Sequence, residues 1–178
     1  MVRLDYGREY PEATRAMTVV DEVVEESMLE PKLLELVKVR ASQLNGCTYC
    51  VDIHTKDARA IGEEEQRLHL VAVWREAPVF TPRERAALAW TEALTLVTQN
   101  GVPDDVYAEV ESSFSPAGHV ALTLAIVAIN GSNRFAIAFR SPVGEYVSRR
   151  EPSPPNAWTH ISPADGEPPT ANSKHDSG

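Results

Sequence analysis

The chain has 178 residues, of which 43% are hydrophobic, and a formal net charge of −9 at pH 7. This length and composition fit a globular domain that can bury a hydrophobic core. The excess of acidic residues repels phosphate groups, which argues against nucleic acid and against an anionic membrane surface as partners.

Neither a secretory signal nor a membrane-spanning segment is expected. The first residues, Met1 to Tyr6, lack an apolar stretch followed by small residues at a cleavage site. The longest apolar run, Val120 to Ile129, covers about ten residues, whereas a bilayer needs roughly 20. We therefore predict a cytoplasmic protein with no membrane contact.

Helical periodicity, together with helix-start and helix-stop residues, predicts about seven helices. In chain order, the expected ranges are 12–29, 31–44, 47–62, 63–75, 82–99, 104–112 and a last helix that begins after Ser115. Pro31 suits the first turn of a helix, because its missing N–H needs no partner there. Thr81 and Glu84 form a capping box at the start of the fifth helix. Asn130-Gly131 predicts a bend or a break in the last helix.

No segment alternates between apolar and polar residues as a half-buried strand does, so the sequence predicts an all-α fold. Residues 1–150 form the expected domain. Residues 151–178 are rich in Pro, Ser, Asp and Glu, and this composition buries too little apolar surface to offset the entropy lost on ordering. We predict that this segment is a disordered Pro-rich tail.

The chain's two cysteines, Cys47 and Cys50, share one short segment. A disulfide stabilises a fold mainly by closing a loop in the unfolded chain, and a bridge between such near neighbours closes almost none. The pair is therefore better explained by thiol chemistry than by stability. On a helix, His54 lies on the same face as both cysteines and one turn beyond Cys50, within reach for proton transfer.

This arrangement suits a dithiol–disulfide cycle. The thiolate is the reactive form of cysteine, and it is favoured both by a helix N-terminus and by a neighbouring histidine base. A second thiol one turn away can convert a sulfenic acid into a disulfide before further oxidation. The helix dipole favours Cys47 as the attacking thiol, whereas His54 favours Cys50.

Other interpretations of the pair are weaker. A structural zinc site usually has four ligands, and only Cys47, Cys50 and His54 lie together in the sequence. Covalent haem attachment needs a histidine directly after the second cysteine, where this chain has Val51. A thioredoxin-like motif would follow a strand, and none is expected. The simplest alternative is that both thiols pack as small apolar residues. We expect neither a metal nor a cofactor.

The segment from Leu33 to Arg59 resembles the carboxymuconolactone decarboxylase superfamily and, within it, the AhpD-like alkylhydroperoxidases. Residues 74–78 and 84–93 strengthen the resemblance, which extends over about residues 3–146. The shared pattern comprises Glu35, both cysteines and the histidine. Some relatives carry a second histidine directly before the second cysteine, where this chain has Tyr49.

The resemblance implies an all-helical, AhpD-like bundle that assembles into trimers or hexamers. It implies that Glu35 orients and polarises His54, which deprotonates Cys50 through a water molecule. Cys50 would attack a peroxide and become a sulfenic acid, and Cys47 would resolve it as a disulfide. The expected activity is that of a thiol-dependent peroxidase. The expected partners are a small-molecule peroxide, a dithiol reductant or lipoyl-type adaptor protein, and further copies of the chain.

Two other functions stay open at this point. One is a decarboxylase that acts on a lactone-type ring, although such chemistry should not need a redox-active cysteine pair. The other is a non-catalytic redox sensor or adaptor that uses the same disulfide. Among the remaining residues, we expect Asp57 to be a solvated carboxylate on a helix face. We expect Trp74, Trp90 and Phe114 to lie in the core or at a subunit interface.

Overall fold

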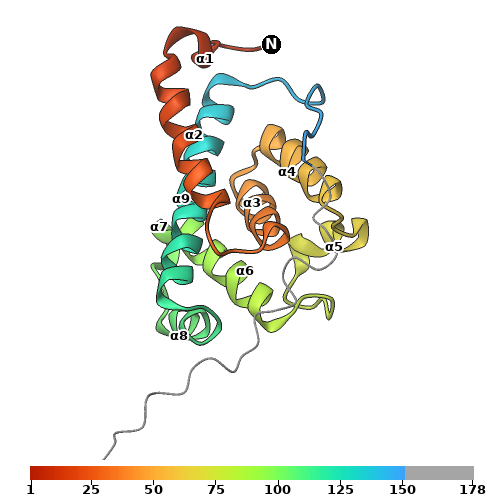
Figure 1. The fold of residues 1–178 in the computed structure, drawn as a ribbon, viewed down its shortest axis with the longest axis vertical. Coiled ribbons are helices and arrows are strands. Elements are labelled where there is room, and N and C mark those ends of the chain that lie inside the picture. The colour runs from red at the N-terminus through yellow and green to blue at the C-terminus, as the bar shows by residue number, and fades with distance from the viewer. Residues whose placement is uncertain (151–178) are drawn as a thin grey trace, which may run out of the picture.

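The structure, a computed structural model, describes residues 1–150, so the predicted tail, 151–178, lies outside the described residues. Residues 1–150 form helices and no strand, which confirms the predicted all-α class (Figure 1). In chain order, the helices are α1 (Tyr6–Glu9), α2 (Pro11–Glu25), α3 (Pro31–Asn45), α4 (Thr48–Ala60), α5 (Glu65–Leu70), the 3₁₀ turn η1 (Val71–Val73), α6 (Pro82–Thr95), α7 (Val97–Asn100), α8 (Asp104–Ser113) and α9 (Pro116–Phe139).

Local sequence signals account for where several helices begin. The helices α2, α3, α6 and α9 each have proline in the first turn, where the first N–H groups of a helix have no partner within it. The predicted capping box is present at α6, with reciprocal hydrogen bonds between Thr81 and Glu84. Gly46, in the left-handed region at φ 69°, ends α3 and turns the chain directly into α4. This turn places both cysteines beside the end of α3.

Several of the predicted helices are shorter than expected. The predicted helix 12–29 ends at Glu25, because the Ser27 hydroxyl donates to the carbonyl of Val24 at 2.6 Å and competes with helical hydrogen bonding. The predicted helix 82–99 is divided at Leu96 into α6 and α7. The predicted helix 63–75 is the short α5 followed by η1. Each difference lies at a helix end, where periodicity carries the least information.

Of the bend or break predicted at Asn130-Gly131, the break is wrong, because α9 continues through both residues. The Asn130 amide donates to the Thr95 hydroxyl at 3.0 Å and to the carbonyl of Ile126 at 2.9 Å. At Gly131, an added Cβ would come within 3.1 Å of the Met17 side chain. These two residues therefore serve contacts with α6 and α2 rather than a turn.

The helix α3 lies at the centre of the bundle and contacts α4, α6 and α9 (Figure 1). Its residues Leu36, Val37 and Val39 are fully buried. Trp74, Trp90 and Phe114 are also buried, which fits their predicted place in the core. Because side chains on all sides hold α3 in place, a functional group on this helix has a fixed position.

The apolar character of α9 differs from our expectation. This helix has 24 residues and a mean hydropathy of 1.5 over its most apolar window, so it is long and apolar enough to cross a membrane. It packs against α2, α3 and α6, and its side chains Leu122, Ile126 and Ile129 are buried in the bundle. Core helices of globular domains meet the same criteria. Packing within the bundle accounts for part of the apolar character of α9, since 39% of this window is buried.

After α9, residues 141–150 form an extended segment, here called the strap, that crosses to α4 (Figure 1). The ammonium group of Lys56 donates to the carbonyl of Tyr146 at 2.9 Å, and the N–H of Gly144 donates to the Asp52 carboxylate at 3.1 Å. The Tyr146 hydroxyl donates to Asp57 Oδ1 at 2.8 Å. These bonds fasten the strap along the outer side of α4.

Candidate active site

The two thiols occupy the start of α4. Cys47 is the residue before the helix and acts as its N-cap, because its Sγ accepts the N–H of Cys50 at 3.3 Å. Both cysteines are free thiols and are buried, at 1% and 4% exposure for Cys47 and Cys50. Ionisation of either thiol therefore depends on the protein groups around it rather than on bulk water.

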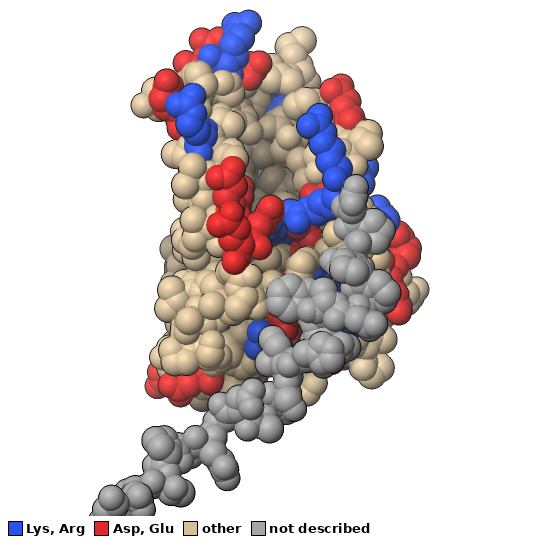
Figure 2. All heavy atoms as spheres, viewed as in Figure 1, with Lys and Arg blue, Asp and Glu red and all other residues tan. Residues whose placement is uncertain are grey.

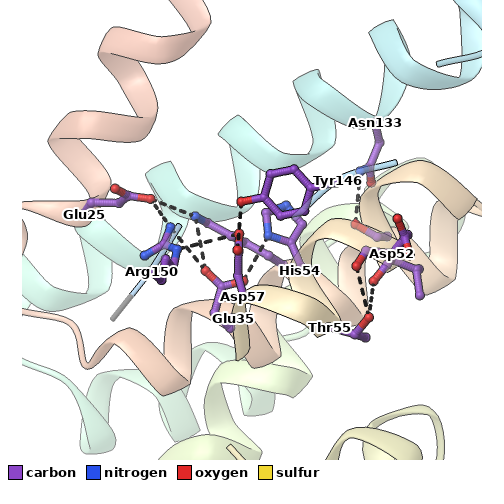
Figure 3. Close-up of polar contacts among 12 residues, drawn as sticks. Glu25, Glu35, Asp52, His54, Thr55, Asp57, Asn133, Tyr146 and Arg150 are labelled. Carbon is purple, nitrogen blue, oxygen red and sulfur yellow. Dashed lines mark hydrogen bonds and ion pairs between the residues drawn. The ribbon is translucent and has the colours of Figure 1, made fainter. Parts of the chain in front are cut away.

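His54 lies one turn beyond Cys50 on α4 and contacts a carboxylate of the central helix (Figure 3). Its Nδ1 is 3.0 Å from Oε2 of Glu35, and the Glu35 side chain is only 1% exposed. A carboxylate that accepts the Nδ1–H leaves Nε2 as the ring nitrogen that can take a proton. The structure thus brings together Glu35 and His54, two residues that the sequence had linked only through a family resemblance.

The Glu35 carboxylate is charged despite its burial. Burial favours the neutral form, but the hydrogen bond from His54 and the positive charges of Lys38 and Arg150 together hold the pKa of Glu35 below its ordinary value. Lys38 Nζ lies 3.8 Å and an Arg150 guanidinium nitrogen 3.4 Å from Glu35 Oε1. A charged Glu35 is the form that can orient the His54 ring.

The two thiols ionise differently. A hydrogen bond from the Cys50 thiol, helped by the N–H groups of Cys50 and Tyr49, lowers the pKa of Cys47 to about 7 against the effect of burial. The same hydrogen bond, with burial and the nearby Cys47 charge, raises the pKa of Cys50 well above its ordinary value. In the reduced protein the first negative charge therefore lies on Cys47, while Cys50 keeps its proton.

This asymmetry predicts the thiol titration of the reduced protein. Because the pKa of Cys47 is about 7, the thiolate should be half formed at neutral pH and should increase as the pH rises through that value. The ultraviolet absorbance of the thiolate measures this step. We expect Cys47→Ala to remove it, and Cys50→Ala to move it to higher pH because Cys47 then loses its S–H donor. A first ionisation at about 8.5, as in a free cysteine, would contradict the assignment.

The two cysteines border different cavities. Cys50 and His54 share a cavity of about 250 Å³ among α1, α2, α4 and α9, lined mainly by apolar and aromatic side chains such as Met17 and Phe135. Cys47 borders a separate cavity of about 190 Å³ at the end of α9. Tyr49 lines both. A small molecule in the larger cavity would therefore meet Cys50 and His54 on the same wall.

One buried polar residue near the site, Asn133, was not predicted. Asn133 on α9 is fully buried, donates to the Ser42 hydroxyl at 3.1 Å and accepts from the Asn45 amide at 2.8 Å. It also hydrogen-bonds Cys50 and lowers the pKa of that thiol, against the larger opposite effects of Cys47 and burial. An asparagine within an apolar helical run was the available signal, because a buried amide needs polar partners.

Asp57 corrects an expectation. We predicted a solvated carboxylate on a helix face, but Asp57 is 3% exposed and accepts a hydrogen bond from the Tyr146 hydroxyl. Helical periodicity places Asp57 on the His54 face, but the strap that covers it comes from a distant part of the sequence. Asp57 therefore belongs to the site's buried polar surroundings.

A carboxylate or imidazole atom from each of Glu35, His54 and Asp57 lies within 4.8 Å of the other two. Carboxylate oxygens and imidazole nitrogens are common ligands of divalent metals. Lys38 and Arg150 contact Glu35, and Arg150 also contacts Asp57 at 3.6 Å. An ammonium and a guanidinium group thus already balance the two carboxylates. We interpret the cluster as an ion-pair network around the histidine.

Known proteins resemble this chain in sequence and in fold. Residues 11–93 match the carboxymuconolactone decarboxylase family, and this range includes both cysteines, Glu35 and His54. The uncharacterised protein YdfG of Bacillus subtilis (strain 168) is 38% identical over 136 residues, which cover 76% of this chain and 92% of YdfG. This chain belongs to the carboxymuconolactone decarboxylase family.

Within the family, the fold is AhpD-like. A crystal structure from Agrobacterium tumefaciens, of a protein of unknown function considered a candidate antioxidant defence protein AhpD, is 42% identical with a TM-score of 0.79. The match covers 82% of this chain and all of that chain. The debrominase Bmp8 has the same fold at 17% identity and a TM-score of 0.70, with 77% of this chain and 74% of Bmp8 covered. At this low identity, the likeness to Bmp8 concerns the fold alone.

Proposed function

We propose that this protein is an alkylhydroperoxidase-type antioxidant enzyme that reduces peroxides through a Cys47/Cys50 dithiol–disulfide cycle. The observation that carries the proposal is the 3.0 Å contact between Glu35 Oε2 and His54 Nδ1, beside a cavity that Cys50 also borders. A thiol, a base and the carboxylate that orients the base are the parts that nucleophilic thiol catalysis needs.

In the proposed cycle, the proton of Cys50 leaves for His54 and the Cys50 thiolate attacks the terminal oxygen of the hydroperoxide. The O–O bond breaks, the alcohol leaves with the proton from His54, and Cys50 becomes a sulfenic acid. The Cys47 sulfur then attacks the Cys50 sulfur, which releases water and forms the disulfide. The two thiols supply both electrons, so the step balances without a metal or an organic cofactor.

The position of the first negative charge adds a condition to this cycle. Because the Cys50 thiol donates to the Cys47 thiolate, attack by Cys50 requires its proton to move first. Cys47 and His54 are the two acceptors near it. Access and charge thus favour different thiols, since Cys50 borders the His54 cavity and Cys47 carries the charge. We assign the attack to Cys50 because Cys50 and His54 border the same cavity.

The cycle also needs a reductant. The family resemblance implies, in addition, that the chain assembles into an oligomer. We propose that a dithiol, free or as the lipoyl group of an adaptor protein, exchanges with the disulfide and restores both thiols. We further propose a homo-oligomer, a trimer or hexamer. We expect the interface of this assembly to bury exposed valines. They lie on α2 and α9: Val19, Val23, Val120 and Val127.

A peroxidase assay with an organic hydroperoxide and dihydrolipoamide tests the proposal. We expect many turnovers with the dithiol present, and consumption of one peroxide per thiol pair without it. Turnover of a lactone substrate by a Cys47→Ser/Cys50→Ser double variant, with no peroxide turnover by the native protein, would favour a decarboxylase. A change in oligomeric state on oxidation, without peroxide turnover, would favour a redox sensor.

A further inference from the structure

The strap brings a cation to the buried carboxylates behind His54. Figure 3 shows Arg150 between Glu25 on one side and Glu35 and Asp57 on the other. Its guanidinium forms an ion pair with Glu25 and lies 3.4 Å from Oε1 of Glu35 and 3.6 Å from Oδ2 of Asp57. Arg150 therefore joins carboxylates from α2, α3 and α4 through one side chain.

The charges around His54 are unequal in number. Among residues 1–150, the charged and titratable groups that face it come from α1, α2, α3, α4 and the strap: Tyr6, Asp21, Glu25, Glu35, Lys38, Tyr49, Cys50, Asp57, Tyr146 and Arg150. Four of these are carboxylates and two are cations. Figure 2 shows acidic and basic side chains meeting in the middle of this face, beneath a hollow. Without Arg150, Lys38 would be left to balance all four carboxylates.

The positive charge of Arg150 stabilises Oε1, the Glu35 oxygen that lies nearest to it. Oε1 of Glu35 is buried and has no hydrogen-bond partner among the described residues. Its compensation comes from the ammonium of Lys38 at 3.8 Å and the guanidinium of Arg150 at 3.4 Å. A buried carboxylate oxygen is unfavourable without such compensation. The other oxygen, Oε2, is the one that contacts His54.

We propose that Arg150 is a positioning residue for the Glu35–His54 pair. Its positive charge keeps the pair free of an extra proton near neutral pH, so that Glu35 accepts from His54 Nδ1 and Nε2 stays available as a base. When the cation is removed, the local potential becomes more negative, and the pair takes up a proton at higher pH. The kinetic part of this inference rests on the proposed function, but the protonation part does not.

Arg150→Gln tests the inference, with Arg149→Gln as the matched control. Arg149 is exposed and next in sequence, so both variants remove one positive charge from the strap. In the full-length protein, we expect Arg150→Gln to move the NMR titration of the His54 ring to higher pH, because a nearby positive charge is lost. The acidic limb of the pH–rate profile for thiol oxidation should move by the same amount. Arg149→Gln should change neither the His54 titration nor the pH–rate profile. Arg150→Lys, which keeps the positive charge, should leave both close to those of the native protein.

Each outcome has a distinct meaning. A His54 titration in Arg150→Gln that matches the control would overturn the inference, as would a loss of rate that is equal at every pH. If the His54 titration shifts in Arg150→Gln but the native protein turns over no peroxide, the inference is supported and the proposed function is refuted. If Arg150→Gln does not fold, Arg150→Met, which keeps the aliphatic stem, should give the same shift.

Discussion

Cys50→Ser is expected to lower peroxide reduction to the rate of the uncatalysed reaction, because Cys50 is the thiol that borders the His54 cavity. A serine hydroxyl at this position neither ionises near neutral pH nor accepts oxygen from a peroxide. Consumption of an organic hydroperoxide, with dihydrolipoamide as reductant, measures the loss. Circular dichroism of the variant should match the native protein, since Ser is nearly isosteric with Cys.

Cys47→Ser gives the matched comparison. This variant keeps the thiol that faces the cavity but lacks the resolving thiol, so we expect one oxidation without turnover. Cys50 should then remain as a sulfenic acid, which dimedone labelling and mass spectrometry detect. If Cys47→Ser abolishes the first oxidation while Cys50→Ser retains it, Cys47 is the attacking thiol, as its lower pKa would suggest.

His54→Gln is expected to slow thiol oxidation by about 10²–10³-fold near neutral pH, the usual range for loss of a general base. The deficit should shrink as the pH rises, because hydroxide then removes the proton that His54 takes in the native protein. Stopped-flow measurement of the oxidation across pH tests both statements. A deficit that is the same at all pH values would indicate that His54 is structural.

His69→Gln is the control for this experiment. The His69 side chain on α5 is 65% exposed and pairs only with Glu65 among the described residues, at 3.3 Å. We expect native activity at every pH. Glu35→Gln should fall between the two variants, because an amide oxygen can still accept from His54 Nδ1 but brings no negative charge.

Helix starts were predictable from the sequence because their signals are local. Pro31 and the Thr81–Glu84 box act through bonds within one turn, and the structure contains both features as predicted. Helix continuity was less predictable where tertiary contacts decide it. The continuous α9 is an example, since Asn130 and Gly131 have roles that depend on α6 and α2.

The site divides in the same way. Cys47, Cys50 and His54 were predictable as a group because they are neighbours on one helix. Glu35 was singled out only through family resemblance, and the structure places it against His54. Arg150 was not predictable, because it follows His54 by almost a hundred positions and its contacts depend on the path of the strap. Periodicity thus predicts which site residues share a helix, whereas the path of the folded chain decides which distant charged residues contact them.

The Cys47 sulfur also stabilises the start of α4, because it is the acceptor that caps the first turn of this helix. As a thiolate, it is a strong acceptor placed at the positive end of the helix dipole. Once it enters a disulfide, the sulfur loses its negative charge and becomes a weaker acceptor. Oxidation therefore exchanges a helix cap for a covalent bond. The folding free energy of the helix that carries His54 then depends on whether the protein is reduced or oxidised.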